Sequence, residues 1–293
     1  MSTFGFTSTA EEVTAGLDLK GQTIVVTGCN SGIGQETARV LALRGAHVIG
    51  TARTVDKARE ALAPFGKETT PVACDLAEPK DVARASKAIA GLGKKLDAIV
   101  CNAGIMALPE RTLSHGHELQ FLTNHLGHFN LVMGLVSSLA PKGRVVVVSS
   151  GAHTNAPEGG IVFHDLTLKD GYQPWKAYGQ SKLANVLFAR ALAKRLPKGQ
   201  TANALHPGVI KTNLTRHIGD AIFSRLDPKI MKTVPQGAAT QTLLAVHPSV
   251  AEVTGEYFSD CRRAETSEYG QDDALAERLF VESEKWVKSL LAA

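Results

Sequence analysis

Short apolar runs alternate with segments of helical spacing along the chain from about residue 22 onward. Four segments carry apolar residues at helical spacing: 34–45, 79–92, 116–139 and 173–196. Seven apolar runs have the length and composition of strands: TIVVTG (23–28), HVIGTA (47–52), TPVACD (70–75), DAIVCNAG (97–104), RVVVVSS (144–150), TANALHPG (201–208) and GEYFSD (255–260). This alternation predicts βαβ units, and therefore an α/β fold with a doubly wound parallel sheet and helices on both faces.

No repeat, low-complexity tract or Pro/Gly-rich linker interrupts this pattern. We therefore expect a short N-terminal arm over residues 1–20 and a single domain over residues 21–293. Two long connections depart from the alternation, at 151–173 and at 209–234.

The connection 209–234 has apolar residues spaced among polar ones, which predicts a lid with one apolar face over a substrate. The alternative is that this face packs permanently on the core. The spaced apolar residues are Ile210, Leu214, Ile218, Ile222, Phe223, Leu226, Ile230 and Met231.

The overall charge narrows the classes of partner. Of the 293 residues, 44% are hydrophobic and 20% charged, and the formal net charge is +4. This charge is small and spread out without a run of Lys or Arg, which argues against nucleic acid as a partner. No stretch reaches the roughly 18 apolar residues of a membrane span, and the first residues do not resemble a secretion signal. We therefore expect a cytoplasmic protein.

The four cysteines, Cys29, Cys74, Cys101 and Cys261, are far apart in the sequence. They form no CxxC pair and no Cys/His pair at the spacing of metal ligands. We interpret them as free buried thiols in a reducing compartment, and we expect no metal site.

A glycine-rich turn joins the first predicted strand to the first predicted helix, with Gly28, Gly32 and Gly34 in the stretch VVTGCNSGIG. Such a turn presents backbone N–H groups and the positive end of a helix to a diphosphate. Glycines allow positive φ and let phosphates approach without a Cβ in the way. The spacing G-x-x-x-G-x-G differs from the G-x-G-x-x-G of two-half Rossmann dehydrogenases. The strand before the turn and the helix after it nevertheless indicate a nucleotide site.

Arg53 follows the second predicted strand, where an acidic residue would bind the adenosine ribose of NAD. The neighbourhood reads Thr51-Ala52-Arg53 and contains no carboxylate before Asp56. A guanidinium can pair with a 2′-phosphate through two hydrogen bonds, which favours NADP. The alternative is that Arg53 is an ordinary solvated surface residue.

Tyr178 and Lys182 are four residues apart in the predicted helix 173–196, so they project from one face of it. A nearby ammonium favours the phenolate and would lower the pKa of the tyrosine from its ordinary value near 10. The pattern Y-x-x-x-K is common and is often a surface pair. Here it follows a strand that ends in Ser149 and Ser150, which favours a functional site.

Seven motifs of the chain occur in the order of the short-chain dehydrogenase/reductase family, which the sequence resembles. They are TGCNSGIG (27–34), CDL (74–76), CNAG (101–104), the Asn124 of LTNHLGHF, VVSS (147–150), YGQSK (178–182) and HPGVIKT (206–212). The resemblance covers about residues 20–260. The start TSTAEEVTAGLDLKG and the tail GEYFSDCRRAE are similar to the retinol dehydrogenase and WW-domain oxidoreductase branch. A Rossmann-like fold is what the resemblance implies.

The resemblance also implies catalytic roles. Tyr178 would be the general acid/base that gives its proton to a carbonyl oxygen as hydride arrives from the nicotinamide. Lys182 would hydrogen-bond the nicotinamide ribose and lower the pKa of the tyrosine. Ser150 would bind and polarise the substrate oxygen, whereas Ser149, its neighbour on the strand, would point into the sheet. Asn124 would position a water that links Lys182 to solvent.

The cofactor site that the resemblance implies spans the carboxyl ends of the strands. Asp75 and Leu76 would bracket the adenine. The residues expected to contact NADP(H) are Gly28, Asn30, Ser31, Gly32, Ile33, Gly34, Arg53, Asp75, Leu76, Asn102, Ala103, Gly104, Tyr178, Lys182, Pro207, Gly208, Val209 and Thr212.

One departure from the family concerns the number of residues between Ser150 and Tyr178 along the chain, which is larger than in most members. The extra stretch HTNAPEGGIVFHDLTLKDGYQPWKA (153–177) resembles that of the retinol dehydrogenase branch. We interpret it as an elaborated wall of the substrate pocket.

Several histidines have plain structural interpretations. His125 and His128 would bind a metal only if a third ligand joined them, and the resemblance places both on a packed helix. We expect His206, at a strand end, to bond to the backbone. Four further histidines are expected at the surface or at the pocket rim: His115, His117, His153 and His164.

The expected function is the interconversion of a carbonyl and an alcohol by an NADP(H)-dependent oxidoreductase, with a lipophilic small-molecule substrate and without metal. One alternative is reduction of an activated C=C bond, which related light-dependent pigment reductases perform with the same tyrosine and lysine. Another is a cofactor-sensing binding protein without catalysis, which predicts loss of Tyr178, Lys182 or Ser150; all three are present. The subunit number stays open, with a homodimer or a homotetramer as candidates.

Overall fold

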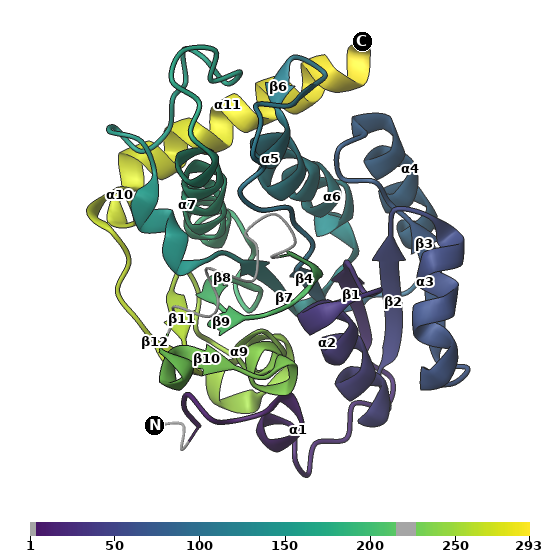
Figure 1. Ribbon diagram of the computed structural model, residues 1–293. Coiled ribbons are helices and arrows are strands. Elements are labelled where there is room, and N and C mark those ends of the chain that lie inside the picture. The colour runs from purple at the N-terminus through teal and green to yellow at the C-terminus, as the bar shows by residue number, and fades with distance from the viewer. Residues whose placement is uncertain (1–3, 215–226) are drawn as a thin grey trace.

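An eight-stranded sheet forms the centre of the protein in the computed structural model, which describes residues 4–214 and 227–293 (Figure 1). Its order is β12-β11-β8-β7-β4-β1-β2-β3, and β12 is the antiparallel member. The strands are β1 (Thr23–Thr27), β2 (His47–Ala52), β3 (Thr69–Ala73), β4 (Leu96–Cys101), β7 (Leu139–Val148), β8 (Thr201–His206), β11 (Tyr257–Ser259) and β12 (Arg262–Arg263). The predicted doubly wound parallel sheet is confirmed.

Helices cover both faces of this sheet (Figure 1). One face is covered by α2 (Gly32–Leu43), α3 (Val55–Leu62) and α9 (Val234–Val246), with the short α1 (Ala10–Val13) packed on α9. The other face is covered by α4 (Pro79–Ala90), α6 (Gly127–Leu135) and α7 (Pro174–Ala193), and α11 (Asp273–Ala292) lies over α7 as an outer layer. The short α10 (Glu268–Gln271) precedes α11.

The central strands supply both halves of the core. In β7, Val145 and Val147 belong to the core beneath α6 and α7, whereas Val146 and Val148 belong to the core beneath α2 and α9. All four side chains are buried. A parallel strand covered on both faces must be apolar at successive positions, which explains the run RVVVVSS.

The helical segment predicted at 116–139 is broken in the structure. A small hairpin of β5 (Leu113–Ser114) and β6 (His117–Glu118) comes first. The Glu118 side chain then accepts a hydrogen bond of 2.9 Å from the Phe121 amide and starts the helix. The segment continues as α5 (Leu119–Phe121), a π-helical turn (Leu122–Leu126) and α6. A side-chain cap thus decides where the helix begins.

Among the described helices of eight or more residues, α3, α9 and α11 were not among the predicted segments. Helix α3 has only eight residues. Every residue of α9 from Gly237 to Val246 is buried, so its sequence shows no polar face and little helical periodicity. Burial on all sides hides the pattern from which a helix is predicted.

The connection 209–234 is described only at its two ends. Near its beginning, β9 (Val209–Ile210) pairs in parallel with β10 (Met231–Lys232) near its end, and a 3-10 turn spans Pro228–Ile230. The predicted lid residues Ile218, Ile222, Phe223 and Leu226 lie outside the described residues. The lid therefore stays a prediction.

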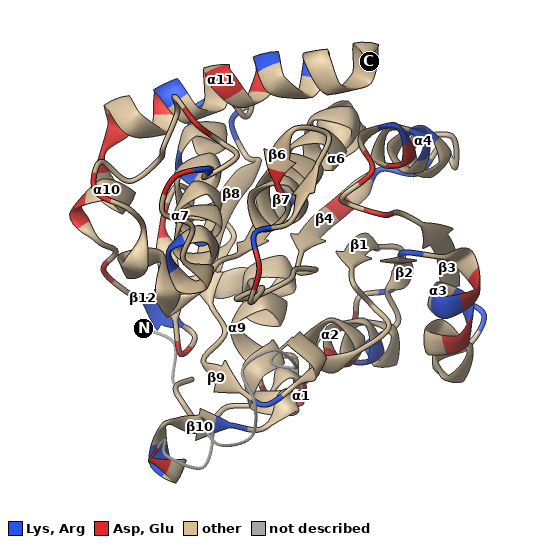
Figure 2. Cartoon of the chain, turned by 45° about the horizontal axis from the view of Figure 1, so that its top comes forward, with Lys and Arg blue, Asp and Glu red and all other residues tan. Residues whose placement is uncertain are grey.

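Charged side chains of both signs are interspersed on α3, α4 and α11 (Figure 2). Such mixing agrees with the small net charge of the sequence. The described part of the chain contains no helix with the length and apolar character needed to cross a membrane.

Helix α11 is attached to α7 by aromatic and ionic contacts. The ring of Phe280 lies 5.0 Å from that of Phe129 and 6.2 Å from that of Phe188, between ring centroids. The guanidinium of Arg195 lies 3.9 Å from the Phe280 ring centroid and 2.5 Å from the Glu277 carboxylate. These contacts close the core on the α7 side.

His125 lies in the same aromatic core. Its ring centroid is 5.2 Å from that of Phe121 and 6.0 Å from that of Phe188, and its Nε2 is 2.8 Å from the Ser283 hydroxyl. Burial lowers the pKa of His125 to about 3. The imidazole is therefore neutral in the folded state and takes up a proton near pH 6.5 only when the chain unfolds.

This difference makes stability depend on pH. Because the folded pKa is lowered, the contribution of His125 is complete above pH 6.5 and is lost as the pH falls toward 3. The His125→Phe variant should remove about one proton from the uptake on unfolding. The slope of unfolding free energy against pH between pH 5 and 6 should then fall by about 1.4 kcal/mol per pH unit.

Urea unfolding at several pH values measures this slope. The matched control is His164→Gln, because His164 is exposed, and this variant should keep the wild-type slope. An unchanged slope in His125→Phe would show that the folded protein already carries the proton.

Candidate active site

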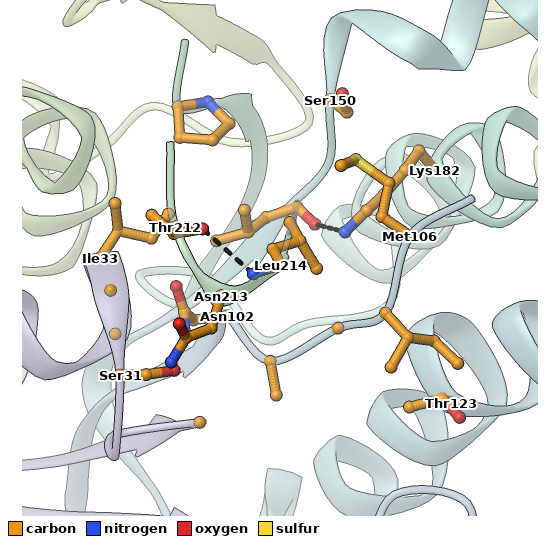
Figure 3. A pocket seen from close by; sticks show the side chains of 18 of the residues that line it. Ser31, Ile33, Asn102, Met106, Thr123, Ser150, Lys182, Thr212, Asn213 and Leu214 are labelled. Atoms are coloured by element: carbon orange, nitrogen blue, oxygen red, sulfur yellow. Dashed lines mark hydrogen bonds between the residues drawn. The ribbon is translucent and has the colours of Figure 1, made fainter. Parts of the chain in front are cut away.

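A cavity of about 1240 Å³ opens at the carboxyl ends of the parallel strands. All of the residues predicted to bind cofactor line it, as does Ser150. The predicted site residue Asn124 does not. Ser31 and Asn102 lie on one side of the view in Figure 3, Ser150 and Lys182 lie on the other, and Leu214 lies between them.

The glycine-rich turn brings α2 close to the end of β4. An added Cβ at Gly34 would lie 2.2 Å from the side-chain nitrogen Nδ2 of Asn102. One at Gly28, where φ is +68°, would lie 3.0 Å from Ala103 Cα. Ser31, the N-cap residue of α2, makes no capping hydrogen bond with its side chain. The first-turn residues of α2 line the cavity, so their N–H groups can receive an anion. The cradle thus fits a diphosphate.

Buried hydrogen bonds hold this end of the sheet together. The Thr27 hydroxyl accepts from the amides of Asn102 at 2.9 Å and Ala103 at 3.0 Å. His128 lies between this hydroxyl and the Asn124 carbonyl, with Nε2 2.9 Å from Thr27 Oγ1 and Nδ1 2.9 Å from Asn124 O. Because a carbonyl only accepts, Nδ1 carries the proton and Nε2 accepts from Thr27. Burial lowers the pKa of His128 to about 4, in keeping with this neutral form.

Asn124 lies behind the cavity wall. Its amide donates to the Ile105 carbonyl and to the Ser181 hydroxyl, both at 2.9 Å, and its Oδ1 accepts from the Ile105 amide at 2.8 Å. The side chain therefore fixes the loop that follows β4 onto α7. Its expected role in positioning a water stays a prediction.

The end of β7 is bonded directly to α7. Ser149 Oγ donates to the Lys182 carbonyl at 2.7 Å, and Lys182 Nζ donates to the Val148 carbonyl at 3.0 Å. Both serines border the cavity, but Ser149 is buried and bonded to α7, whereas Ser150, the next residue, is partly exposed, in keeping with strand alternation. We call this set of bonds the β7–α7 contact.

Gly179 allows α7 to approach this closely. An added Cβ there would lie 2.7 Å from the Ala152 carbonyl oxygen in the 3-10 turn that follows Ser150 (Gly151–Asn155). Sequence reasoning missed Gly179, although a glycine in the middle of a helix next to Tyr178 was a readable signal.

Tyr178 and Lys182 are both buried beside the cavity, and the Lys182 ammonium lies 5.6 Å from the centroid of the tyrosine ring. Burial raises the pKa of Tyr178 to about 12, and its hydrogen bond with Ser150 opposes this rise. Burial also lowers the pKa of Lys182 to about 8. The lowering expected for the tyrosine is not found here, because desolvation outweighs the hydrogen bond with Ser150.

Arg53, which follows β2, lines the cavity together with Lys57. Asp56 is paired with Arg59 at 2.5 Å, on the first turns of α3. Sequence reasoning missed Lys57; its place four residues after Arg53 was the available signal. The cavity thus carries two basic side chains where a carboxylate would favour NAD.

The opposite end of the cavity is largely apolar. Its lining includes Met106, Leu119 and Trp175, and the ring centroid of Trp175 is 6.1 Å from that of Tyr178. Among the described residues that line the whole cavity, the aspartate, lysine and arginine side chains are Arg53, Lys57, Asp75 and Lys182.

The extra stretch 153–177 forms the wall only in part. Asn155 and Trp175, near its two ends, line the cavity. Residues between them border a separate small hollow of about 250 Å³. The interpretation as a pocket wall is therefore correct only for the ends of the stretch.

His153 was expected at the surface or at the pocket rim, and this prediction is wrong. The side chain is buried; Nδ1 lies 2.7 Å from the Ser150 carbonyl, and Nε2 accepts from the Ser267 amide at 3.1 Å. His153 therefore connects Ser150 to the segment before α11. His206 does bond to the backbone, as expected, because its Nδ1 accepts from the Gly151 amide at 3.0 Å.

The four cysteines are free and buried, as predicted. Within residues 4–214 and 227–293, no three His, Cys, Asp or Glu side chains are grouped as metal ligands would be. His125 and His128 bond instead to Ser283 and Thr27.

Comparison with known proteins identifies the family. Residues 22–222 match the family model described as short chain dehydrogenase. The chain is 40% identical over 306 residues to short-chain dehydrogenase TIC 32 A, chloroplastic, of Brassica napus, with 99% of this chain and 96% of the relative covered. It is 37% identical over 296 residues to human retinol dehydrogenase 14, with 92% and 87% covered. Both relatives extend over nearly the whole chain.

Solved structures agree with this assignment. A putative uncharacterized protein from Mycobacterium paratuberculosis has a TM-score of 0.76 at 31% identity, with 97% of this chain and 98% of that chain covered. A short chain dehydrogenase from Burkholderia cenocepacia J2315 in complex with NADP has a TM-score of 0.67 at 26% identity, with 82% and 96% covered. The motif order, the strand order and these matches lead to one conclusion: the chain belongs to the short-chain dehydrogenase family and is an oxidoreductase of that family.

Proposed function

We propose that this oxidoreductase uses NADP(H) to interconvert a lipophilic ketone or aldehyde and the corresponding alcohol. The observation that carries the proposal is the position of Ser150, Tyr178 and Lys182 on the wall of the cavity whose other end holds the glycine-rich turn and Arg53. Proton donor and cofactor cradle thus share one cavity. A binding protein without catalysis would have no need of the Ser150 and Tyr178 hydroxyls at this place.

Each side chain has a role in the proposed reaction. Bound NADP(H) would supply or accept the hydride at its nicotinamide. The Tyr178 hydroxyl, protonated at neutral pH, donates its proton to the substrate oxygen during reduction, while the Ser150 hydroxyl orients that oxygen. Lys182, with a pKa of about 8, can exchange a proton near neutral pH and favours the phenolate in the oxidative direction.

The preference for NADP rests on charge. Arg53 and Lys57 both line the adenine end, and a 2′-phosphate would give each of them an ionic partner. The related structure from Burkholderia cenocepacia contains NADP. Cytoplasmic location stays a prediction from the free thiols, and the plant relative is named as chloroplastic. Subunit number stays open.

Removal of the proton donor tests the reaction. Tyr178→Phe should lower kcat by about 10²–10⁴-fold, the range that a general acid contributes, and leave the NADPH dissociation constant nearly unchanged. Steady-state assay and NADPH titration of the same preparation measure both quantities. Turnover like that of the wild type would rule out Tyr178 as the acid.

Assays with an unsaturated and a saturated carbonyl compound separate reduction of a C=O bond from reduction of a C=C bond.

Removal of the basic residues tests cofactor choice. The wild type should prefer NADPH to NADH in kcat/KM, and Arg53→Ala should weaken NADPH binding by about 1.5–3 kcal/mol, with little change for NADH. Lys57→Ala should act in the same direction. Arg59→Ala is the control, because this side chain pairs with Asp56 and does not line the cavity. Equal losses for NADPH and NADH in Arg53→Ala would contradict the proposal.

Substrate size tests the apolar end. Each buried methylene contributes roughly 0.8 kcal/mol, so kcat/KM should rise about fourfold per carbon along a ketone series until the cavity is full. Trp175→Ala should flatten the series, and Leu113→Ala, an exposed residue outside the cavity, should not. A flat or falling series for the wild type would contradict a lipophilic substrate.

Hydrogen exchange of residues 209–234, measured with and without NADP plus substrate, tests the predicted lid separately.

A further inference from the structure

Lys232 is a buried cation behind the cavity wall. Its side chain is 1% exposed, and Nζ lies 2.5 Å from Asp260 Oδ1. The ring of Phe6 covers the ammonium at 4.9 Å from its centroid. A buried ammonium needs such partners, because the loss of water is costly without them.

The aliphatic part of Lys232 supports the cofactor loop, residues 207–210. An added Cβ at Gly208, where φ is +105°, would lie 2.6 Å from Lys232 Cδ and 3.1 Å from Cε. Lys232 also pairs with Ile210 in the β9–β10 ladder. Residues 207–210 line the cavity, whereas Lys232 lies behind them and does not. The position of Lys232 therefore decides where the backbone of this loop lies.

Asp260 is aimed at Lys232 by a tight turn. Asp260 and Cys261 join β11 to β12 with φ values of +52° and +60°. Two successive residues with positive φ are typical of a type I′ hairpin turn. A turn of this kind holds the Asp260 backbone beside Lys232, within reach of its ammonium.

Residues 4–9 place Phe6 over this ion pair. The Arg262 guanidinium donates to the Phe4 carbonyl at 2.9 Å, and the Gln236 amide donates to the Thr7 carbonyl at 3.2 Å. The segment is thus attached to β12 on one side of Phe6 and to the first turn of α9 on the other. The Phe6 residue is 36% exposed, and the Lys232 ammonium lies against its ring.

We propose that Phe6 and Lys232 are positioning residues for the cofactor: Phe6 fixes Lys232, Lys232 fixes residues 207–210, and the N-terminal segment thereby sets the affinity for NADP(H). The inference rests on the proposed function only for the identity of the cofactor. Neither residue lines the cavity, so each acts through the loop. Chemistry at Tyr178 should be unaffected once the cofactor is bound.

Phe6→Ala is the test variant, and Thr9→Ala is the control. Thr9 caps α1 through Glu12, so its loss weakens the N-terminal arm without removing a contact to Lys232. Phe6→Ala should raise the NADPH dissociation constant about three- to tenfold, on the scale of a partly desolvated cation–π contact. In this variant kcat at saturating NADPH should stay within about twofold of the wild type. Thr9→Ala should leave both within about twofold.

Two measurements separate positioning from general destabilisation. Without cofactor, the amides of residues 208–210 should exchange hydrogen faster in Phe6→Ala than in the wild type or in Thr9→Ala. Lys232→Ala should weaken NADPH binding more than Phe6→Ala does, and the double variant should bind no worse than Lys232→Ala alone, because one residue acts through the other.

The inference would be overturned if the losses of NADPH affinity from the two substitutions multiplied in the double variant. It would also be overturned if hydrogen exchange at residues 208–210 were the same in Phe6→Ala as in the wild type. A wild-type protein that does not bind NADPH would overturn the proposed cofactor instead. Hydrogen exchange at residues 208–210 is measured without cofactor. It therefore shows whether Phe6 positions this loop even if the wild type does not bind NADPH.

Discussion

The β7–α7 contact is the constraint on which the site depends. Two donors, Lys182 Nζ and Asn185 Nδ2, share the Val148 carbonyl at 3.0 and 3.1 Å, and Ser149 donates back to the backbone of α7. A carbonyl at the end of a parallel strand would otherwise be left without a strand partner. Its use here fixes the rotation of α7, so that Tyr178 faces the cavity beside Ser150. The ammonium to which the proposed reaction gives a role thus also helps to hold the helix in place.

Close approaches of backbone explain why glycines occur where they do. Gly34 lets α2 meet Asn102, and Gly179 lets α7 meet the turn after Ser150. Each removes one side chain so that two elements from different parts of the chain can share one cavity. Nearby, His128 bonds to Thr27 and Asn124, and His153 bonds to Ser150 and Ser267. Burial lowers the pKa of both histidines. Burial thus has two effects in this site: it fixes geometry, and it sets protonation.

The sequence predicted the sheet, the glycine-rich turn and the placement of Tyr178 on the lysine face of its helix, because these depend on local periodicity and spacing. It did not predict the contacts of His153 with Ser267 or of Lys232 with Phe6, since both join residues far apart in the chain. The pKa of the tyrosine was expected in the wrong direction, because spacing gives the neighbouring charge but not the loss of water. Helix α9 was missed for a related reason, as burial on every side removes the polar face.

The packing of α11 has a consequence for how the protein is made. Helix α11 follows every strand of the sheet in the chain, yet Phe280 completes an aromatic core with Phe129 and Phe188, which belong to earlier helices. During synthesis, the cofactor half can form while the outer face of α7 is still uncovered and apolar. A chain that ends before residue 273 keeps every residue that lines the cavity, but it leaves the aromatic rings of Phe129 and Phe188 without Phe280. An exposed apolar surface of this kind makes a chain prone to aggregation.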